Sequence, residues 1–254
     1  MKKSIKILSL ILGFVLVLTS FAGCGEDKKT EESETEEKKT KEKFELSIGE
    51  LNYYYFTTWY NFYQSAIQYE QYMGQGAGLA YTGYDYTKAP NEQPLTEEAA
   101  EMYGVTLEEI GNTENPTWAD GIAYAAINTY ATTTYGAKMA KENNITLTEE
   151  EQSCIDGTIE ELKTNAEQCE YTLDEWLSMQ YGKGVTEQII RTAMENGYLS
   201  AAYYNSLQDS NTNELVEEAT KEYKTSEILK DEKYKTAIDE QNQHIKNLLD
   251  ASIS

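Results

Sequence analysis

The residue types that most often carry catalysis are scarce in this chain. His244 is the single histidine, and it lies in a polar segment near the C-terminus, where a surface position is expected. Without a second histidine or a Cys-x-x-Cys pair, a transition-metal site lacks its usual ligands. The chain also has no Gly-x-Ser-x-Gly sequence, so a hydrolase triad built on a nucleophile elbow is unsupported.

Phosphate, nucleotide and calcium sites are equally unsupported. The glycines of GQGAG, 74–78, follow a helical pattern rather than a strand, so the context of a dinucleotide-binding loop is missing. GKG, 182–184, lacks the remainder of a phosphate loop. Acidic pairs are abundant, but no spaced Asp/Asn loop of the EF-hand kind accompanies them. The sequence therefore predicts no catalytic residue, no cofactor and no metal site, and it favours a binding protein over an enzyme.

The most unusual stretch is ELNYYYFTTWYNFYQ, residues 50–64, in which eight of fifteen side chains are aromatic. Apolar residues at helical spacing predict a helix over about 48–73 that is aromatic on most of its circumference. Such a helix is usually central and packed on more than one side. The alternative is a surface that binds an apolar partner, for which the candidate residues are Tyr53, Tyr54, Trp59, Tyr60 and Tyr63. Both interpretations remain open at this point.

The elements that must position this helix are themselves helices. Four predicted helix starts carry a Ser or Thr with a Glu three residues later, the pattern of a capping box, at Ser47, Thr106, Thr148 and Thr172. Further helices are expected over 118–142, 149–167, 172–182 and 186–208, and one or two amphipathic helices over 211–251. The alanines and threonines of 118–142 would let a neighbouring helix approach closely. Residues 74–95 are expected to be a long irregular connection. The fold class is therefore all-α.

The first residues have the layout of a secretory signal. Lys2, Lys3 and Lys6 precede an apolar run over 7–18, which is too short for a comfortable membrane span. The sequence Phe-Ala-Gly-Cys that ends at Cys24 resembles the lipobox of bacterial lipoproteins. That resemblance implies acylation of Cys24, including attachment of palmitate or a similar chain, and an anchor on the outer face of the cell membrane.

Composition divides the chain into four parts. Residues 1–23 are the expected signal peptide, and 24–43 are a charged tether with no large apolar residue, too polar to fold. Residues 44–210 form the expected helical domain, and 211–254 a C-terminal helical segment that packs back on it. The chain has 21 basic and 44 acidic residues and a net charge of −23, with Arg191 as its single arginine. Such a charge repels nucleic acid, which is excluded as a partner.

Two cysteines remain in the folded part. If Cys154 and Cys169 lie on one helix, the rise per residue keeps them about 22 Å apart. A disulfide needs Cα atoms within about 7 Å, so it would form only if the helix ended between them. Two buried free thiols are the expected outcome, with the disulfide as the alternative.

Three stretches together suggest a family. Residues 83–93, 117–152 and 171–205 resemble, in their order, the helical N-terminal domain of SurA/PrsA-type foldases, as found in lipoproteins of Gram-positive anaerobes. That resemblance implies a SurA N-terminal-like helical domain that holds unfolded exported polypeptides. A parvulin-type isomerase domain, which often follows in that family, does not fit in the short charged tail. In related chains a C-terminal helix returns to the helical domain, and residues 233–251 are the expected counterpart.

The function expected from this resemblance is that of a membrane-anchored holdase, a chaperone-like lipoprotein that binds unfolded exported polypeptides without an isomerase of its own. Client contact is then expected at Tyr53, Tyr54, Trp59, Tyr60 and Tyr63. Two alternatives stay open. One is a solute-binding or structural surface lipoprotein, and the other is a vestigial peptidyl-prolyl isomerase.

Overall fold

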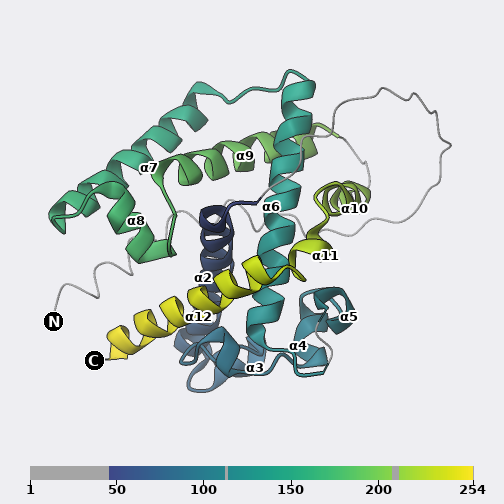
Figure 1. Cartoon of the computed structure of the whole chain (residues 1–254), viewed down its shortest axis with the longest axis vertical. Coiled ribbons are helices and arrows are strands. Elements are labelled where there is room, and N and C mark those ends of the chain that lie inside the picture. Colours follow the sequence, from purple (N-terminus) through teal and green to yellow (C-terminus); the bar gives the residue numbers. More distant parts are fainter. Residues whose placement is uncertain (1–45, 112–113, 208–211, 254) are drawn as a thin grey trace.

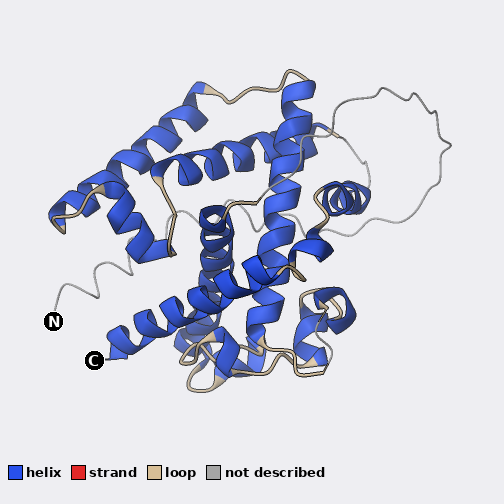
Figure 2. Ribbon diagram, in the orientation of Figure 1, coloured by secondary structure: helices blue, strands red, loops and turns tan. Residues whose placement is uncertain are grey.

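The computed structural model describes residues 46–111, 114–207 and 212–253, which form the all-α fold that the sequence predicts (Figures 1 and 2). Its elements are α2 (Ile48–Met73), α3 (Ala77–Thr82), the 3-10 turn η3 (Pro90–Glu92), α4 (Glu97–Met102), α5 (Leu107–Ile110), α6 (Trp118–Glu142), α7 (Glu149–Gln168), α8 (Leu173–Tyr181), α9 (Glu187–Ser206), α10 (Thr212–Glu222), α11 (Thr225–Ile228) and α12 (Glu232–Ile253). The only β-type pairing among these residues is one isolated antiparallel bridge, between Pro94 and Thr117. The expected signal peptide, the expected tether and Cys24 lie outside the described residues.

The four predicted capping boxes are present. At the start of α2, the Ser47 hydroxyl accepts a hydrogen bond from the Glu50 amide at 3.1 Å, and the Glu50 carboxylate accepts one from the Ser47 amide at 2.9 Å. The same reciprocal pair of bonds forms at Thr106, Thr148 and Thr172. Each box satisfies two amide donors that a helix start would otherwise leave without partners. The local sequence therefore fixes where these four helices begin.

Two expectations about segment type are wrong in detail. Residues 74–95 are not irregular throughout, since they contain α3 and η3. The tail after residue 211 forms three helices rather than one or two. Lys224 takes a left-handed conformation, with φ 50°, between α10 and α11. This residue therefore interrupts the helix at a point that the apolar spacing of the tail did not mark.

Helix α2 lies at the centre of the fold, beside α6 and crossed by α12 (Figure 1). The Tyr55 hydroxyl donates to Asn242 Oδ1 at 2.9 Å, and the Tyr234 hydroxyl donates to the Leu46 carbonyl at 2.8 Å. Ile245 on α12 is fully buried. The segment 233–251 thus packs back on α2, so the last helix of the chain completes the core around the first described one.

Helices α6 and α9 approach closely because small residues face each other. A Cβ added to Gly136 on α6 would lie 2.3 Å from the Ser200 hydroxyl on α9, well inside the sum of van der Waals radii. On the same helix, Ala137 is 1% exposed and Ala140 is fully buried. The alanine- and glycine-rich stretch of α6 is therefore a helix-packing surface, as its composition predicted.

Both cysteines of the described part are free thiols. Cys154 lies within α7 and Cys169 follows its last residue, so the helix holds the two sulfurs apart, as the helical rise requires. The expectation that both thiols are buried is wrong for Cys154, which is exposed, and Cys169 is only half-buried. No helix among the described residues is long and apolar enough to cross a bilayer.

Candidate functional site: an exposed aromatic patch

The five aromatic residues expected to contact clients lie in the core. Their exposed fractions are 7% for Tyr53, 4% for Tyr54, 2% for Trp59, 2% for Tyr60 and 7% for Tyr63. Of the two interpretations of this stretch, core packing is therefore the one that matches the structure. These side chains offer almost no surface to a partner, because α2 is surrounded along this length by α6, α8, α9 and α12. A surface for an apolar partner has to lie elsewhere.

The buried aromatic residues pack in specific pairs. The rings of Tyr54 and Tyr130 meet edge to face with centroids 5.3 Å apart, and Phe56 meets Tyr181 in the same way at 5.3 Å. The Trp59 indole N–H donates to the Tyr84 hydroxyl at 2.8 Å. Burial raises the pKa of Tyr54 to about 12 and that of Tyr181 to about 12, so these phenols stay neutral at any physiological pH.

The exposed large apolar side chains gather at the other end of α2. Seven of the ten in the described part of the chain belong to the last turns of α2, to α3 and to the end of α4. We call this set the aromatic patch: Tyr69, Tyr72, Met73, Leu79, Tyr81, Met102 and Tyr103. Tyr72 is 87% exposed and Met73 is 62% exposed, values that are unusual for such large apolar residues. Clustering of this kind marks a surface used for binding more often than chance exposure does.

Contacts between side chains join the three segments of the aromatic patch. The ring of Tyr69 on α2 stacks on Tyr81 of α3, with centroids 5.1 Å apart. Tyr103, just after α4, meets Phe62 of α2 edge to face at 4.8 Å, and its hydroxyl donates to the Thr82 carbonyl at 3.0 Å. Burial raises the pKa of the Tyr103 phenol to about 12, so this donor keeps its proton. The aromatic patch is thus one connected surface built on packed residues below it.

A carboxylate from α2 holds α3 in place. Glu70 accepts hydrogen bonds from the Gly76 amide at 2.8 Å and from the Gly78 amide at 2.9 Å, which are amides at the start of α3. Gly76 has φ 87°, a left-handed conformation in which glycine is unstrained, and it turns the chain back onto α2. A Cβ at Gly78 would lie 2.6 Å from the Ala66 carbonyl oxygen, so only glycine allows this approach.

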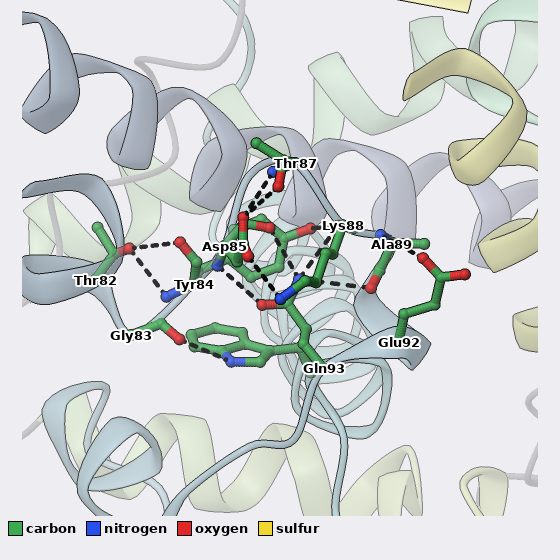
Figure 3. Close-up of polar contacts among 10 residues, drawn as sticks. Thr82, Gly83, Tyr84, Asp85, Thr87, Lys88, Ala89, Glu92 and Gln93 are labelled. Carbon is green, nitrogen blue, oxygen red and sulfur yellow. Dashed lines mark hydrogen bonds and ion pairs between the residues drawn. The ribbon is translucent and has the colours of Figure 1, made fainter. Parts of the chain in front are cut away.

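The loop that follows α3 is ordered by the buried side chain of Gln93 (Figure 3). Its Oε1 accepts from the Asp85 amide at 2.9 Å, and its Nε2 donates to the carbonyls of Asp85 at 3.1 Å and Lys88 at 3.2 Å. One amide side chain therefore replaces the backbone pairing that an irregular loop lacks. Residues 83–93 are fixed in shape, although their sequence suggested an irregular connection.

The same loop is tied to the aromatic core. The Trp118 indole N–H donates to the Gly83 carbonyl at 3.1 Å. Tyr84 is fully buried and receives the hydrogen bond from Trp59. Burial alone would raise the pKa of Asp85, but hydrogen bonds from Thr87 and the Lys88 ammonium outweigh it and lower the pKa. The aromatic patch therefore rests on a folded support that reaches down to the middle of α2.

The charge around the aromatic patch is negative. Glu97, Glu98 and Glu101 are exposed residues of α4, directly before Met102 and Tyr103. Other carboxylates near this end of the fold are paired, since Asp85 binds Lys88 at 2.9 Å and Glu92 binds Lys246. None of the ion pairs between described residues that involve this end of the molecule includes the three glutamates of α4. They leave an acidic edge beside the apolar surface.

A second feature is a hollow of about 340 Å3 between α2, α8 and α12. It is lined by Asn52, Ser178, Met179, Lys183, Glu240, Gln241 and His244. The expectation that His244 is a surface residue is wrong, because the ring is half-buried, 3.2 Å from the Gln180 carbonyl and beside Phe56. Burial lowers the pKa of His244, and its bond to the Gln180 carbonyl acts in the opposite direction. The charges of Lys183 and Glu240 lie 3.6 Å apart and largely cancel at the rim.

Sequence reasoning missed the seven residues of the aromatic patch as a surface. Helical spacing places Tyr69 and Met73 on the same face of α2 as the core residues Leu51 and Tyr55. What it could not show is that the neighbours of α2 end before this face does. A signal was present in GAGLAYTGYDY, 76–86, where apolar side chains alternate with glycines that bring the chain against a helix.

Comparison with known proteins gives no match for this chain: no protein-family model, no curated protein and no solved structure is similar to it.

Proposed function

We propose that this protein is a membrane-anchored, extracytoplasmic holdase, a lipoprotein that binds unfolded exported polypeptides. The observation that carries the proposal is the aromatic patch, a connected set of exposed tyrosine, methionine and leucine side chains on a fixed support. Because the residues expected from the sequence are buried in the middle of α2, we propose the C-terminal end of α2 as the client site instead.

The chemistry of the patch suits clients of varied sequence. Tyrosine contributes a large flat apolar surface with few rotatable bonds, together with a hydroxyl that bonds to backbone groups. Methionine adds an unbranched, polarizable side chain that adapts to different shapes. A surface made of both binds apolar segments through contact area rather than through one fixed sequence, which is what a holdase requires.

Two further features agree with the SurA/PrsA-like interpretation of the sequence. The described residues are helical, and α12 packs on α2 as the returning helix of that family would. The net charge of −23 keeps a protein that carries an apolar client in solution. Acylation at Cys24 would keep the client close to the membrane from which it emerges.

The experiment uses the mature chain, residues 24–254, carrying Cys24→Ser so that it purifies without lipid. Light scattering is followed while a chemically unfolded secreted protein is diluted into buffer with this chain. We expect suppression of aggregation at near-stoichiometric ratios. The variant Tyr72→Ser with Tyr81→Ser should lose most of that suppression, because it removes two exposed rings of the aromatic patch.

The matched control replaces exposed apolar residues outside the patch and outside the hollow, Tyr171→Ser with Val216→Ser, and should suppress aggregation as the unmodified chain does. Both variants must keep the helical circular dichroism of the parent. Suppression that survives loss of the patch, or that fails only in the control, contradicts the assignment of the client surface. An equally acidic unrelated protein that suppresses aggregation to the same extent would remove the proposal altogether.

The hollow between α2, α8 and α12 is the observation that favours a solute-binding lipoprotein as a second candidate. Its volume is in the range of small-molecule sites. Most solute-binding lipoproteins have two α/β lobes, and the described residues of this chain contain no strand. A thermal shift produced by one compound of a small-metabolite panel, and abolished by filling the hollow with Ser178→Leu, would support that candidate. A peptide assay for prolyl isomerisation tests the remaining alternative, and a background rate would remove it.

A further inference from the structure

We infer that the aromatic patch selects polypeptide segments in which lysine or arginine flanks aromatic or aliphatic residues, and that Glu97, Glu98 and Glu101 recognise the positive charges. This inference rests on the proposed function and names the class of client. It combines two independent observations, an exposed apolar surface and an uncompensated acidic edge next to it.

The geometry of α4 places the carboxylates beside the apolar side chains. Glu98 and Met102 are four residues apart on the helix, so they lie on the same side, one turn from each other. Glu101 directly precedes Met102 and Tyr103 in the chain. Ala99 and Ala100 are buried beneath them, which fixes the helix against the fold and leaves the glutamates facing solvent. A ligand that covers Met102 therefore brings its neighbouring residues to the glutamates.

Among the residues that the structure describes, no ion pair offsets these charges. Between residues 66 and 111 the sequence holds a single basic residue, Lys88, against eight acidic ones. Lys88 is bound to Asp85 at 2.9 Å, and Lys246, which approaches from α12, is bound to Glu92. The field at this edge is therefore negative and extends about 8–10 Å at physiological salt, far enough to attract an approaching cation.

The same charges disfavour two other occupants. In a symmetric dimer formed through the aromatic patch, each copy would bring its own acidic edge to the same interface, and the added like charges would disfavour association. An anionic membrane surface would be repelled for the same reason. A cationic segment has the complementary charge, and lysine and arginine side chains can also lay their alkyl stems along tyrosine rings.

The test measures binding of two labelled peptides by fluorescence anisotropy to residues 24–254 carrying Cys24→Ser. One peptide is Lys-Leu-Tyr-Phe-Leu-Lys, and the other has serine at both lysine positions. Each exposed carboxylate–lysine pair changes affinity about two- to fivefold. We therefore expect Glu97→Gln with Glu98→Gln and Glu101→Gln to weaken the cationic peptide about tenfold and to leave the serine peptide unchanged.

A matched control comes from α7. Glu149→Gln with Glu150→Gln and Glu161→Gln removes the same net charge, and Glu149 and Glu150 occupy the first turn of α7 as Glu97 and Glu98 do in α4. This control should change the affinity for the cationic peptide less than about twofold, because α7 lies on the far side of the molecule from α4 (Figure 1). Raising the salt concentration should lower the affinity for the cationic peptide and leave the affinity for the serine peptide unchanged.

The outcomes separate the inference from the proposed function. If Tyr72→Ser with Tyr81→Ser abolishes binding of both peptides while the α4 variant binds them as the parent does, the inference is overturned and the holdase surface stands. If the patch variant binds both peptides normally, the proposed surface fails and the inference fails with it. A stable dimer of the parent that the patch variant dissolves would identify a second copy as the occupant and overturn the inference.

Discussion

Two tyrosine-rich regions of the same helix have opposite environments. The middle of α2, around Tyr53 to Tyr63, is enclosed by α6, α8, α9 and α12, and its tyrosines are at most 7% exposed. The last turns, around Tyr69 and Tyr72, pack against α3 and carry side chains that are 40% and 87% exposed. The two regions share residue types and helical spacing. The comparison teaches that here the length of the neighbouring helices decides whether an aromatic residue becomes core or surface.

The largest expected effect is loss of the fold at high pH through the enclosed region. Burial raises the pKa of Tyr54 and Tyr181 to about 12 and raises that of Tyr53 and Tyr55 well above its ordinary value. A folded-state pKa above the unfolded value of about 10 means that the stabilisation is complete below pH 10 and is lost as pH rises further. Each phenol with a folded-state pKa of about 12 removes about 2 kcal/mol of stability by pH 12.

We therefore expect cooperative unfolding between about pH 10 and 12, because several of these losses together exceed the stability of a typical domain. Helical circular dichroism and the ultraviolet absorbance of tyrosinate should change in one shared transition for the buried phenols. Ionisation of all the tyrosines with the helices intact would show that the middle of α2 is open to solvent. That result would contradict the contrast between a buried middle and an exposed end of this helix.

The second prediction contrasts the two regions with the same chemical change. Tyr54→Ser with Tyr63→Ser should unfold the protein or destabilise it severely, since removing one buried aromatic ring costs about 3–5 kcal/mol. Tyr72→Ser with Tyr81→Ser should change stability by less than about 1 kcal/mol, because exposed positions rarely contribute more. Urea denaturation measures both. Equal destabilisation by the two pairs would mean that the aromatic patch is part of the core.

A third prediction concerns a single hydroxyl in the enclosed region. Tyr55→Phe removes the donor to Asn242 Oδ1 and leaves that fully buried oxygen without this partner, at a cost of about 1–3 kcal/mol. Tyr72→Phe, which changes an 87% exposed side chain, should be neutral. Thermal unfolding of the two variants under one buffer condition makes the comparison. A neutral Tyr55→Phe would indicate that water replaces the bond and that α12 sits loosely on α2.

The smallest effect on overall stability is expected in the support of the aromatic patch. Gly78→Ala would place a Cβ 2.6 Å from the Ala66 carbonyl oxygen, and α3 must shift to relieve the contact, at a cost of about 1 kcal/mol. Hydrogen exchange should quicken in residues 77–82 and stay unchanged in α6. The control is Gly157→Ala in α7, where an added Cβ meets nothing within 4 Å and should stabilise the helix slightly. Unchanged exchange in α3 would show that α3 is not seated on α2.

The sequence allowed the fold to be predicted where the signals are local. A capping box is complete within four residues, so the sequence alone predicts the helix starts at Ser47, Thr106, Thr148 and Thr172. The position of α3 was not predictable in this way, since it depends on Glu70 reaching across a turn and on Gly78 fitting against Ala66. Such contacts depend on how the chain folds in three dimensions, and the spacing of apolar residues along the sequence does not predict them.

The candidate site was predicted in composition and not in place. The aromatic content of α2 left open whether the stretch is core or a binding surface, and the residues selected for client contact are buried. His244 was misplaced for the same reason, because its polar neighbours in the sequence say nothing of Phe56 and Gln180, which pack against it. Burial is a property of several segments together, and one segment read alone does not determine it.

The length of α2 sets the distance between Leu46, where the chain enters the fold, and the aromatic patch. The chain enters the fold at Leu46, where the Tyr234 hydroxyl binds its carbonyl, and the patch begins more than twenty residues later at the far end of the same helix. At about 1.5 Å per residue, α2 is a rigid rod that separates the two by about 35 Å. If Cys24 is acylated as we propose, a pull on the chain at Leu46 would act on the first and last helices, and the aromatic patch would lie at the opposite end of α2.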